Sequence, residues 1–236
     1  MFDNDLTGFD ADSTLAFVAE SRAEADRLET GILVAAALWA DLHGDLDDPD
    51  GRVIPGMEQL IRFGGAGTPG VAEFAPAEMG AELAMSPYAA RQLVADALDL
   101  RYRLPLLWGR VRAGQVKPWI GRKTAEATRD VSVEVAAVVD RRVSGWAHSL
   151  SWGRLEAIIE AAVIAADPAA AAAAAEQAER SQGVWLGQSN DHGVTDILIR
   201  TEAAAAIWFD ASVDRVADGL GLLGDTDTKD VRRAKA

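Results

Sequence analysis

The chain has 236 residues, of which 49% are hydrophobic and 25% charged, and it has no cysteine. These proportions are ordinary for a globular protein with its own core. The absence of cysteine excludes disulfides and thiolate metal sites. No apolar run reaches the roughly 18–20 residues of a membrane span, and the acidic first five residues lack the basic start of a secretory signal. We therefore expect a cytoplasmic protein with no membrane partner.

The net charge of −14 is unevenly distributed. Residues 1–90 carry 4 basic and 17 acidic side chains, residues 91–154 carry 12 and 6, and residues 155–236 carry 7 and 14. A basic central segment between two acidic ones can indicate a surface that binds a polyanion. Local fluctuation along a helical chain produces the same pattern, so charge alone leaves both interpretations open.

The first predicted element is a long helix that Asp12 or Ser13 can cap and that ends near His43. Residues 44–76 break the helical pattern with glycine, proline and aspartate, which predicts a flexible loop with at most a helical turn or two over residues 57–63. The helix has one apolar stripe because large side chains recur at spacings of three, four and seven: Leu15, Val18, Ala25, Leu28, Ile32, Trp39 and Leu42.

Capping residues and first-turn prolines then predict a series of helices. Gly114 stands where a left-handed helix end belongs. An alanine-rich helix starts at Asp167-Pro168. The helices before it are expected over residues 77–84, 86–100, 105–114, 118–129, 132–148 and 151–166.

In about the last fifth of the chain, the helical spacing of the hydrophobic residues gives way to short runs of β-forming residues. β-formers on both sides of the polar turn 189–193 predict a hairpin over residues 183–200, and a helix follows Thr201. Thr228 can cap a further helix, which has little apolar surface and which we expect to continue beyond this sequence. The expected fold is mainly α, a helical bundle with one small hairpin, in which the helical domain 77–236 and the first helix form one structural unit.

Residues 78–93 have the pattern of a helix-turn-helix: a short helix, a tight turn and a second helix opened by a capping serine. In DNA-binding versions, the first residues of the second helix face the base edges. Here these residues are Ser86, Tyr88, Ala89 and Gln92, with Arg91 available for a phosphate. An ordinary hairpin of two helices in a bundle has the same pattern, so the motif is not specific.

Further cations follow at once, interleaved with Tyr102, Trp108 and Trp119. Several cations on one face are what phosphate binding needs, since each neutralised phosphate releases counterions. The alternative is a solvated helical surface with the aromatic side chains in the core. The candidate cations are Arg101, Arg103, Arg110, Arg112, Lys117, Arg122 and Lys123.

The sequence contains no recognisable catalytic or metal-binding constellation. The three histidines, His43, His148 and His192, have no second ligand at metal-binding spacing. The glycine-rich residues 64–70 lack the lysine of a phosphate-binding Walker loop. We therefore expect no catalytic residue, no metal ion and no other cofactor in this chain.

Short motifs in a fixed order suggest a family. They are Glu82-Leu83-Ala84-Met85-Ser86-Pro87-Tyr88-Ala89-Ala90-Arg91, Arg103-Leu104-Pro105, Val111-Arg112-Ala113-Gly114-Gln115-Val116, Asp167-Pro168, Val184-Trp185-Leu186 and Asp230-Val231-Arg232-Arg233-Ala234-Lys235-Ala236. In these motifs and in their order, the chain resembles the actinobacterial 13E12-repeat family, which has a DUF222-type domain of unknown function.

The resemblance implies a helical domain that precedes an HNH endonuclease module, in which a histidine and a divalent cation act. No position in this sequence matches that module, so no catalytic residue is carried over. Taken together with the basic residues of this sequence, the resemblance suggests a non-catalytic domain of an HNH endonuclease-like protein that engages DNA through residues 91–129. The alternative is a protein-interaction or homo-oligomerisation domain. Cations clustered on one exposed face would favour the first, and cations paired within the chain beside an exposed first-helix stripe would favour the second.

Overall fold

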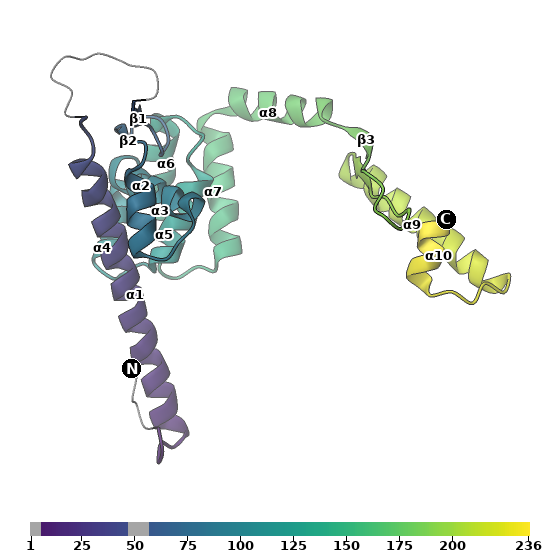
Figure 1. Ribbon diagram of the computed structural model, residues 1–236, viewed down its shortest axis with the longest axis horizontal. Helices are drawn as coiled ribbons and strands as arrows, with labels where there is room; N and C mark the ends of the chain where they lie inside the picture. Colours follow the sequence, from purple (N-terminus) through teal and green to yellow (C-terminus); the bar gives the residue numbers. More distant parts are fainter. Residues whose placement is uncertain (1–5, 47–56) are drawn as a thin grey trace. The chain divides into compact units, whose positions relative to one another are not determined.

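The structure is a computed structural model that describes residues 6–46 and 57–236. It is mainly helical, with two small antiparallel strand pairs (Figure 1), as the sequence predicts. The chain forms two compact units, Met1–Pro168 and Ala169–Ala236. The helices expected to make one domain over residues 77–236 are thus distributed over both units, which are described separately below.

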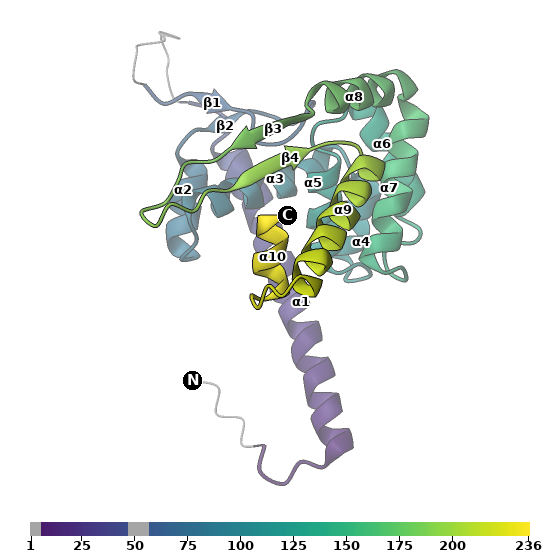
Figure 2. The same ribbon diagram turned by 90° about the vertical axis from the view of Figure 1, so that its right-hand side faces the viewer.

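Helix α1, Ala11–Leu42, is the long first helix that the apolar stripe predicts. Its cap is Asp10 and not Asp12 or Ser13 as predicted, because the Oδ1 atom of Asp10 accepts a hydrogen bond from the Ser13 nitrogen at 2.8 Å. The first half of the helix extends out of the unit in both views (Figures 1 and 2). Its buried residues all lie in the second half: Leu33, Ala36, Ala37 and Ala40.

Two short strands replace the helical turn considered over residues 57–63. Strand β1, Leu60–Ile61, pairs antiparallel with β2, Val71–Ala72. Strand β2 is buried, and the Ala72 nitrogen donates to the His43 carbonyl at the end of α1 at 2.8 Å. These long-range hydrogen bonds hold the part of the expected loop after residue 57. Residues 47–56 of that loop lie outside the described residues.

Helix α3, Pro87–Tyr102, is the centre of the first unit. All residues from 93 to 100 are buried, and α1, α2, α4 and α5 pack on this helix. Helices α6 and α7 pair with each other, and α4 contacts α6. The helices around α3 are α2, Ala75–Glu82; α4, Pro105–Arg112; α5, Pro118–Ala127; α6, Val133–Val143; and α7, Trp152–Ala166.

Most predicted helix starts are confirmed. The hydroxyl groups of Ser86 and Ser132 accept hydrogen bonds from the nitrogens three residues on, at 3.2 and 3.3 Å. Helix α4 is capped from a distance: the Asp140 carboxylate of α6 accepts from the Leu106 and Leu107 nitrogens at 2.8 and 2.9 Å. Helix α6 ends at residue 143 and not at residue 148, because the backbone enters a series of turns there.

The second unit contains the predicted hairpin. Strand β3, Gly183–Leu186, pairs antiparallel with β4, Ile197–Arg200, in the register Val184↔Ile199 and Leu186↔Ile197. The remaining elements are α8, Pro168–Arg180; α9, Ala203–Leu222; and α10, Lys229–Lys235. None of the described helices is, taken singly, long and apolar enough to cross a membrane.

Helix α10 is attached to α9 by charge and not by apolar burial. Arg233 pairs with Asp210 and Asp214, and Lys229 lies 3.6 Å from Asp214 and 3.4 Å from Asp218. The predicted cap is confirmed, since the Thr228 hydroxyl accepts from the Val231 nitrogen. Counting apolar side chains alone therefore underestimates what holds this helix.

Candidate functional site

The helix-turn-helix pattern is built as an ordinary helical hairpin. The Met85 nitrogen donates to the Gly80 carbonyl at 2.9 Å and closes the turn between α2 and α3, with Ala84 in the left-handed region at φ 51°. A Cβ atom on Gly80 would lie 2.8 Å from Cβ of Ala90, so the glycine lets the two helices approach closely. The spacing of this motif thus reflects helix packing.

Little of the predicted recognition helix reaches the surface. Tyr88 is 72% exposed and Arg91 is exposed, whereas Gln92 is half-buried and accepts a hydrogen bond from Nη1 of Arg129 at 2.5 Å. The Ser86 hydroxyl is engaged as the cap. Because residues 93–100 are all buried, only the first turns of α3 and its last two residues, Arg101 and Tyr102, reach the surface.

Arg103 is an internal residue. Its side chain has no exposed surface, and Nη1 donates to Oδ1 of Asp99 at 3.2 Å and to the Arg129 carbonyl at 3.1 Å. Nη2 donates to the Val131 carbonyl at 2.5 Å, and Nε has no hydrogen-bond partner. In this structure Arg103 therefore offers nothing to DNA.

Arg129 completes a buried ionic cluster. Its Nε atom donates to Oδ2 of Asp99 at 2.8 Å, and Nη2 donates to Oδ1 of Asp96 at 2.6 Å. Arg122 donates through Nε to Oδ2 of Asp96 at 2.8 Å. Burial raises the pKa of the Asp96 carboxyl, and its hydrogen bonds to Arg122 and Arg129 oppose that rise. The cluster joins α3 to α5 and to the turn after α5.

Arg101 is also paired within the unit. Its Nη1 atom lies 2.6 Å from Oδ2 of Asp41 at the end of α1, and this hydrogen bond raises the pKa of the arginine. Of the candidate cations, Arg101, Arg103 and Arg122 thus hold helices together. A sequence signal for this existed: Asp96, Asp99 and Arg103 lie on one face of an otherwise apolar helix, at spacings of three and four.

The other cations of the basic segment form no ion pair within the described residues. Three of the six carboxylates of residues 91–154, Asp96, Asp99 and Asp140, are buried. Because Arg103, Arg122 and Arg129 are taken up by two of these carboxylates, the surface formed by this segment keeps the excess of basic side chains that its sequence shows. The cations without an ion pair are Arg91, Arg110, Arg112, Lys117, Lys123, Arg141, Arg142 and Arg154.

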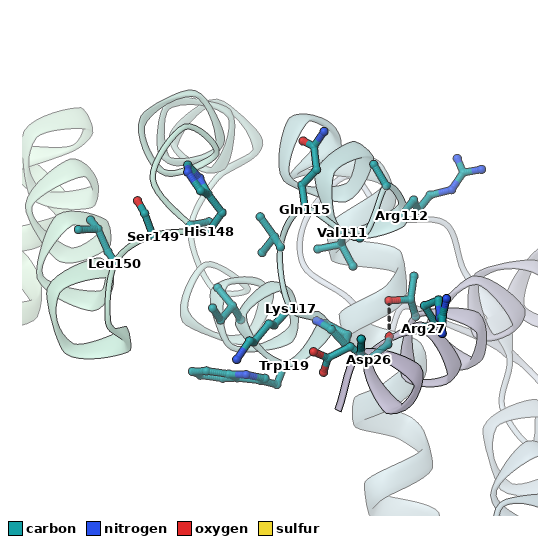
Figure 3. Close-up of a pocket in the computed structure, with 18 of the residues that line it drawn as sticks. Asp26, Arg27, Val111, Arg112, Gln115, Lys117, Trp119, His148, Ser149 and Leu150 are labelled. Carbon is teal, nitrogen blue, oxygen red and sulfur yellow. Dashed lines mark hydrogen bonds between the residues drawn. The ribbon is translucent and has the colours of Figure 1, made fainter. Parts of the chain in front are cut away.

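A groove of about 750 Å³ collects some of these cations. It lies between α1, the α4–α5 turn and the α6–α7 turn. In Figure 3, His148 and Ser149 lie on one side of it, Val111, Arg112 and Arg27 lie on the other, and Lys117 lies between them. Arg27 also pairs with Glu24, and the groove carboxylate of Asp26 pairs with Arg22.

Two helices begin at the groove. Lys117 is the N-cap residue of α5 and Ser151 that of α7, and neither makes a side-chain cap hydrogen bond. The first N–H groups of both helices therefore add positive potential to that of the side chains. The rings of Trp119 and Trp152 line the same groove with their centroids 6.3 Å apart, and Nζ of Lys123 lies 5.1 Å from the Trp152 ring.

This combination of groups suits a ligand in which an anionic group lies next to flat, less polar parts. Cations and free N–H groups bind phosphate oxygens, and indole rings offer surfaces for sugars or bases. Over residues 6–46 and 57–236, no three His, Cys, Asp or Glu side chains are grouped as a metal ion would need. His43 lies against the Trp39 ring and His192 lies in the hairpin turn, so they are apart from His148 in the groove.

Comparison with known proteins identifies the family and no closer relative. The model of the family described as "Domain of unknown function (DUF222)" matches residues 57–236, which is most of the chain. No curated protein and no solved structure matches it. The matched segment contains the buried ionic cluster and every part of the groove except α1. The chain therefore belongs to the DUF222 family.

Proposed function

We propose that the first unit binds the phosphate backbone of DNA through the groove, as the non-catalytic part of an HNH endonuclease-like protein. The observation that carries the proposal is that Arg112, Lys117, Arg27 and His148 all line one groove, at the start of two helices. The link to an HNH module rests on the resemblance to the 13E12-repeat family. A continuation of the gene that encodes such a module would test that link.

The interface proposed here is smaller than the cationic segment of the sequence. Arg112 and Lys117 contact the phosphates, and Lys123 lies next to the groove on the Trp152 ring. Arg101, Arg103 and Arg122 stabilise the unit. Arg110 is half-buried on α4, and Tyr88 and Arg91 lie on the first turns of α3, so these residues form no part of the groove.

The chemistry predicts binding without strong sequence preference. Phosphate contacts fix the position of a protein on DNA, whereas base contacts specify the sequence. The overall charge of −14 repels DNA, so the affinity depends on few contacts and on the salt concentration. Binding is therefore expected to be weak and to weaken steeply as salt is added.

The test compares two pairs of charge-neutralising variants by fluorescence anisotropy with a short labelled duplex. The groove pair is Arg112→Gln with Lys117→Gln. The control pair is Arg200→Gln with Arg215→Gln, which removes the same charge from two exposed residues of the second unit that form no described ion pair. We expect the groove pair to weaken binding at least ten-fold and the control pair to leave most of the affinity. Equal losses would reject the groove as the interface.

A further inference from the structure

One tryptophan of the first unit borders two cavities. Trp119 of α5 lines the groove, and it also lines a second cavity of about 430 Å³, which is called the hollow below. Two other tryptophans of this unit have evident structural roles, since Trp108 is only 8% exposed and Nε1 of Trp39 donates to the Ala75 carbonyl at 2.7 Å. Trp119 is 37% exposed and thus keeps surface that a ligand can contact.

Charge distinguishes the two cavities. The groove is lined by Arg112 and Lys117, which form no ion pair within residues 6–46 and 57–236. The two charged residues of the hollow are Glu29 and Arg122, and Arg122 already donates to Asp96. A phosphate is therefore attracted to the groove, whereas the hollow suits an uncharged and less polar group. The apolar side chains of the hollow include Ile32, Leu83, Met85 and Leu93.

The aromatic surface lies next to the cations. Trp119 follows Lys117 by two residues at the start of α5, so the two side chains can contact neighbouring parts of one ligand. The rings of Trp119 and Trp152 are inclined at 58°, with their centroids 6.3 Å apart, so they do not stack face to face. Nζ of Lys123 lies 5.1 Å from the Trp152 ring. A phosphate beside a flat ring is the chemistry of a nucleotide.

We propose that the groove and the hollow bind an unpaired stretch of a DNA strand in preference to a duplex. This inference rests on the proposed function of the groove. A base stacks on Trp119 at the hollow, while Lys117 and Arg112 bind the phosphates of the same strand. Every base has a π-face, so stacking of this kind requires no particular sequence.

A duplex cannot use the indole ring in this way. Its bases are covered on both faces by their neighbours, and taking one out of the stack costs unstacking and unpairing energy. An unpaired strand avoids most of that cost. The cations serve both forms, because both carry phosphates. The general attraction to DNA thus depends on Arg112 and Lys117, and the preference for an unpaired strand depends on Trp119.

Fluorescence anisotropy with the full chain tests this preference. The probe is one labelled thymidine oligonucleotide, used alone or annealed to its complement, at the same salt concentration. We expect the single strand to bind about five-fold more tightly than the duplex, or better, which is the effect of stacking one base. Equal affinities, or tighter binding of the duplex, would overturn the proposal.

Three variants show whether Trp119 is responsible. Trp119→Leu keeps an apolar side chain without the ring, and Trp119→Phe keeps a ring. The matched control is Trp146→Leu, since Trp146 is 58% exposed and lines neither cavity. We expect Trp119→Leu to lose about five-fold or more in affinity for the single strand and to bind the duplex as the wild type does. Trp119→Phe should keep most of the single-strand affinity, and Trp146→Leu should keep all of it.

The remaining outcomes separate this proposal from the proposed function. Equal losses for strand and duplex in Trp119→Leu would mean that the ring only supports the fold, and would overturn the preference. A free thymidine mononucleotide should not displace the labelled strand at the same phosphate concentration. Displacement would show that the site takes a single nucleotide and not a strand. Duplex binding that depends on Arg112 and Lys117 without any preference for the strand would leave the proposed function standing and reject this inference. Absence of binding to either form would reject both.

Discussion

Asp99 and Arg103, one helical turn apart on α3, form an ion pair at 3.2 Å in which neither side chain has exposed surface. The same Oδ1 atom of Asp99 accepts a hydrogen bond from the Gly65 nitrogen at 2.7 Å, and Oδ2 accepts from Arg129 at 2.8 Å. One buried carboxylate thus joins the glycine-rich loop, α3 and the end of α5. Three of the candidate cations, Arg101, Arg103 and Arg122, thus fasten the unit, whereas Arg112 and Lys117 line the groove.

Replacing Asp99 and replacing Arg103 should lower the free energy of unfolding by different amounts. Asp99→Ala leaves Arg103 buried with only carbonyl partners, so we expect a loss of about 3–5 kcal/mol in the free energy of unfolding. Arg103→Met leaves Asp99 bound to Arg129 and Gly65, and leaves two carbonyl groups without this donor, so the loss should be smaller, about 1–3 kcal/mol. Urea denaturation measures both. A larger loss for the arginine variant would show that Asp99 is not the centre of the cluster.

Gly65 is expected to tolerate no side chain. A Cβ atom there would lie 2.0 Å from Nη1 of Arg103 and 2.3 Å from the Arg129 carbonyl, and both neighbours are fixed by the cluster. Overpacking of this kind costs about 1–3 kcal/mol or more. The control is Gly109→Ala, where a Cβ meets nothing within 4 Å inside α4. It should stabilise the helix by up to about 1 kcal/mol. Similar melting temperatures for the two variants would contradict the close contact at Gly65.

Asp140 predicts a pH dependence with a defined sign. Burial raises the pKa of its carboxyl, against the hydrogen bonds from the Leu106 and Leu107 nitrogens. The folded state then holds the proton at a higher pH than the unfolded chain does. The stabilising contribution is full below the unfolded pKa and is lost as pH rises through the folded value.

The stability advantage of the wild type over Asp140→Asn should therefore widen as the pH falls from about 7 toward the unfolded pKa. Urea denaturation of both proteins at several pH values measures this difference. An advantage that narrows on acidification would mean that the capping hydrogen bonds outweigh burial and lower the pKa of Asp140.

The purified chain should not cleave DNA when magnesium or manganese is added. The described residues contain no group of three His, Cys, Asp or Glu side chains that could hold a metal ion, and the three histidines lie in separate places. A plasmid-nicking assay checks this. Metal-dependent cleavage that one histidine substitution abolishes would refute it, and would require a site that the sequence and the fold do not reveal.

Local signals predicted most of the helices. Pro87, Pro105 and Pro118 each begin a helix, Ser86 and Ser132 cap theirs, and Gly114 has the expected positive φ of 69°. The hairpin was predictable from its β-formers. The strands β1 and β2 were not, because a strand of two residues has no period to detect.

The buried cluster and the groove depend on tertiary structure. The spacing of Asp96, Asp99 and Arg103 indicates that they can pair on one helix face, but it does not indicate burial, since charged side chains are usually exposed. The groove unites Arg27, Lys117 and His148, which come from distant parts of the chain, and no spacing rule relates them. Local sequence patterns also do not predict the ion pairs of α10 with Asp210, Asp214 and Asp218, because these pairs join α10 to another helix, α9.

The salt dependence of DNA affinity tests the central claim most directly. Neutralising one phosphate-binding cation should reduce the slope of log affinity against log salt by about 1. The variant with Arg112→Gln and Lys117→Gln should therefore bind more weakly and with a slope smaller by about 2, whereas Arg200→Gln with Arg215→Gln should keep the wild-type slope. An unchanged slope in the groove variant, beside wild-type binding that is measurable and salt-dependent, would show that DNA contacts another surface.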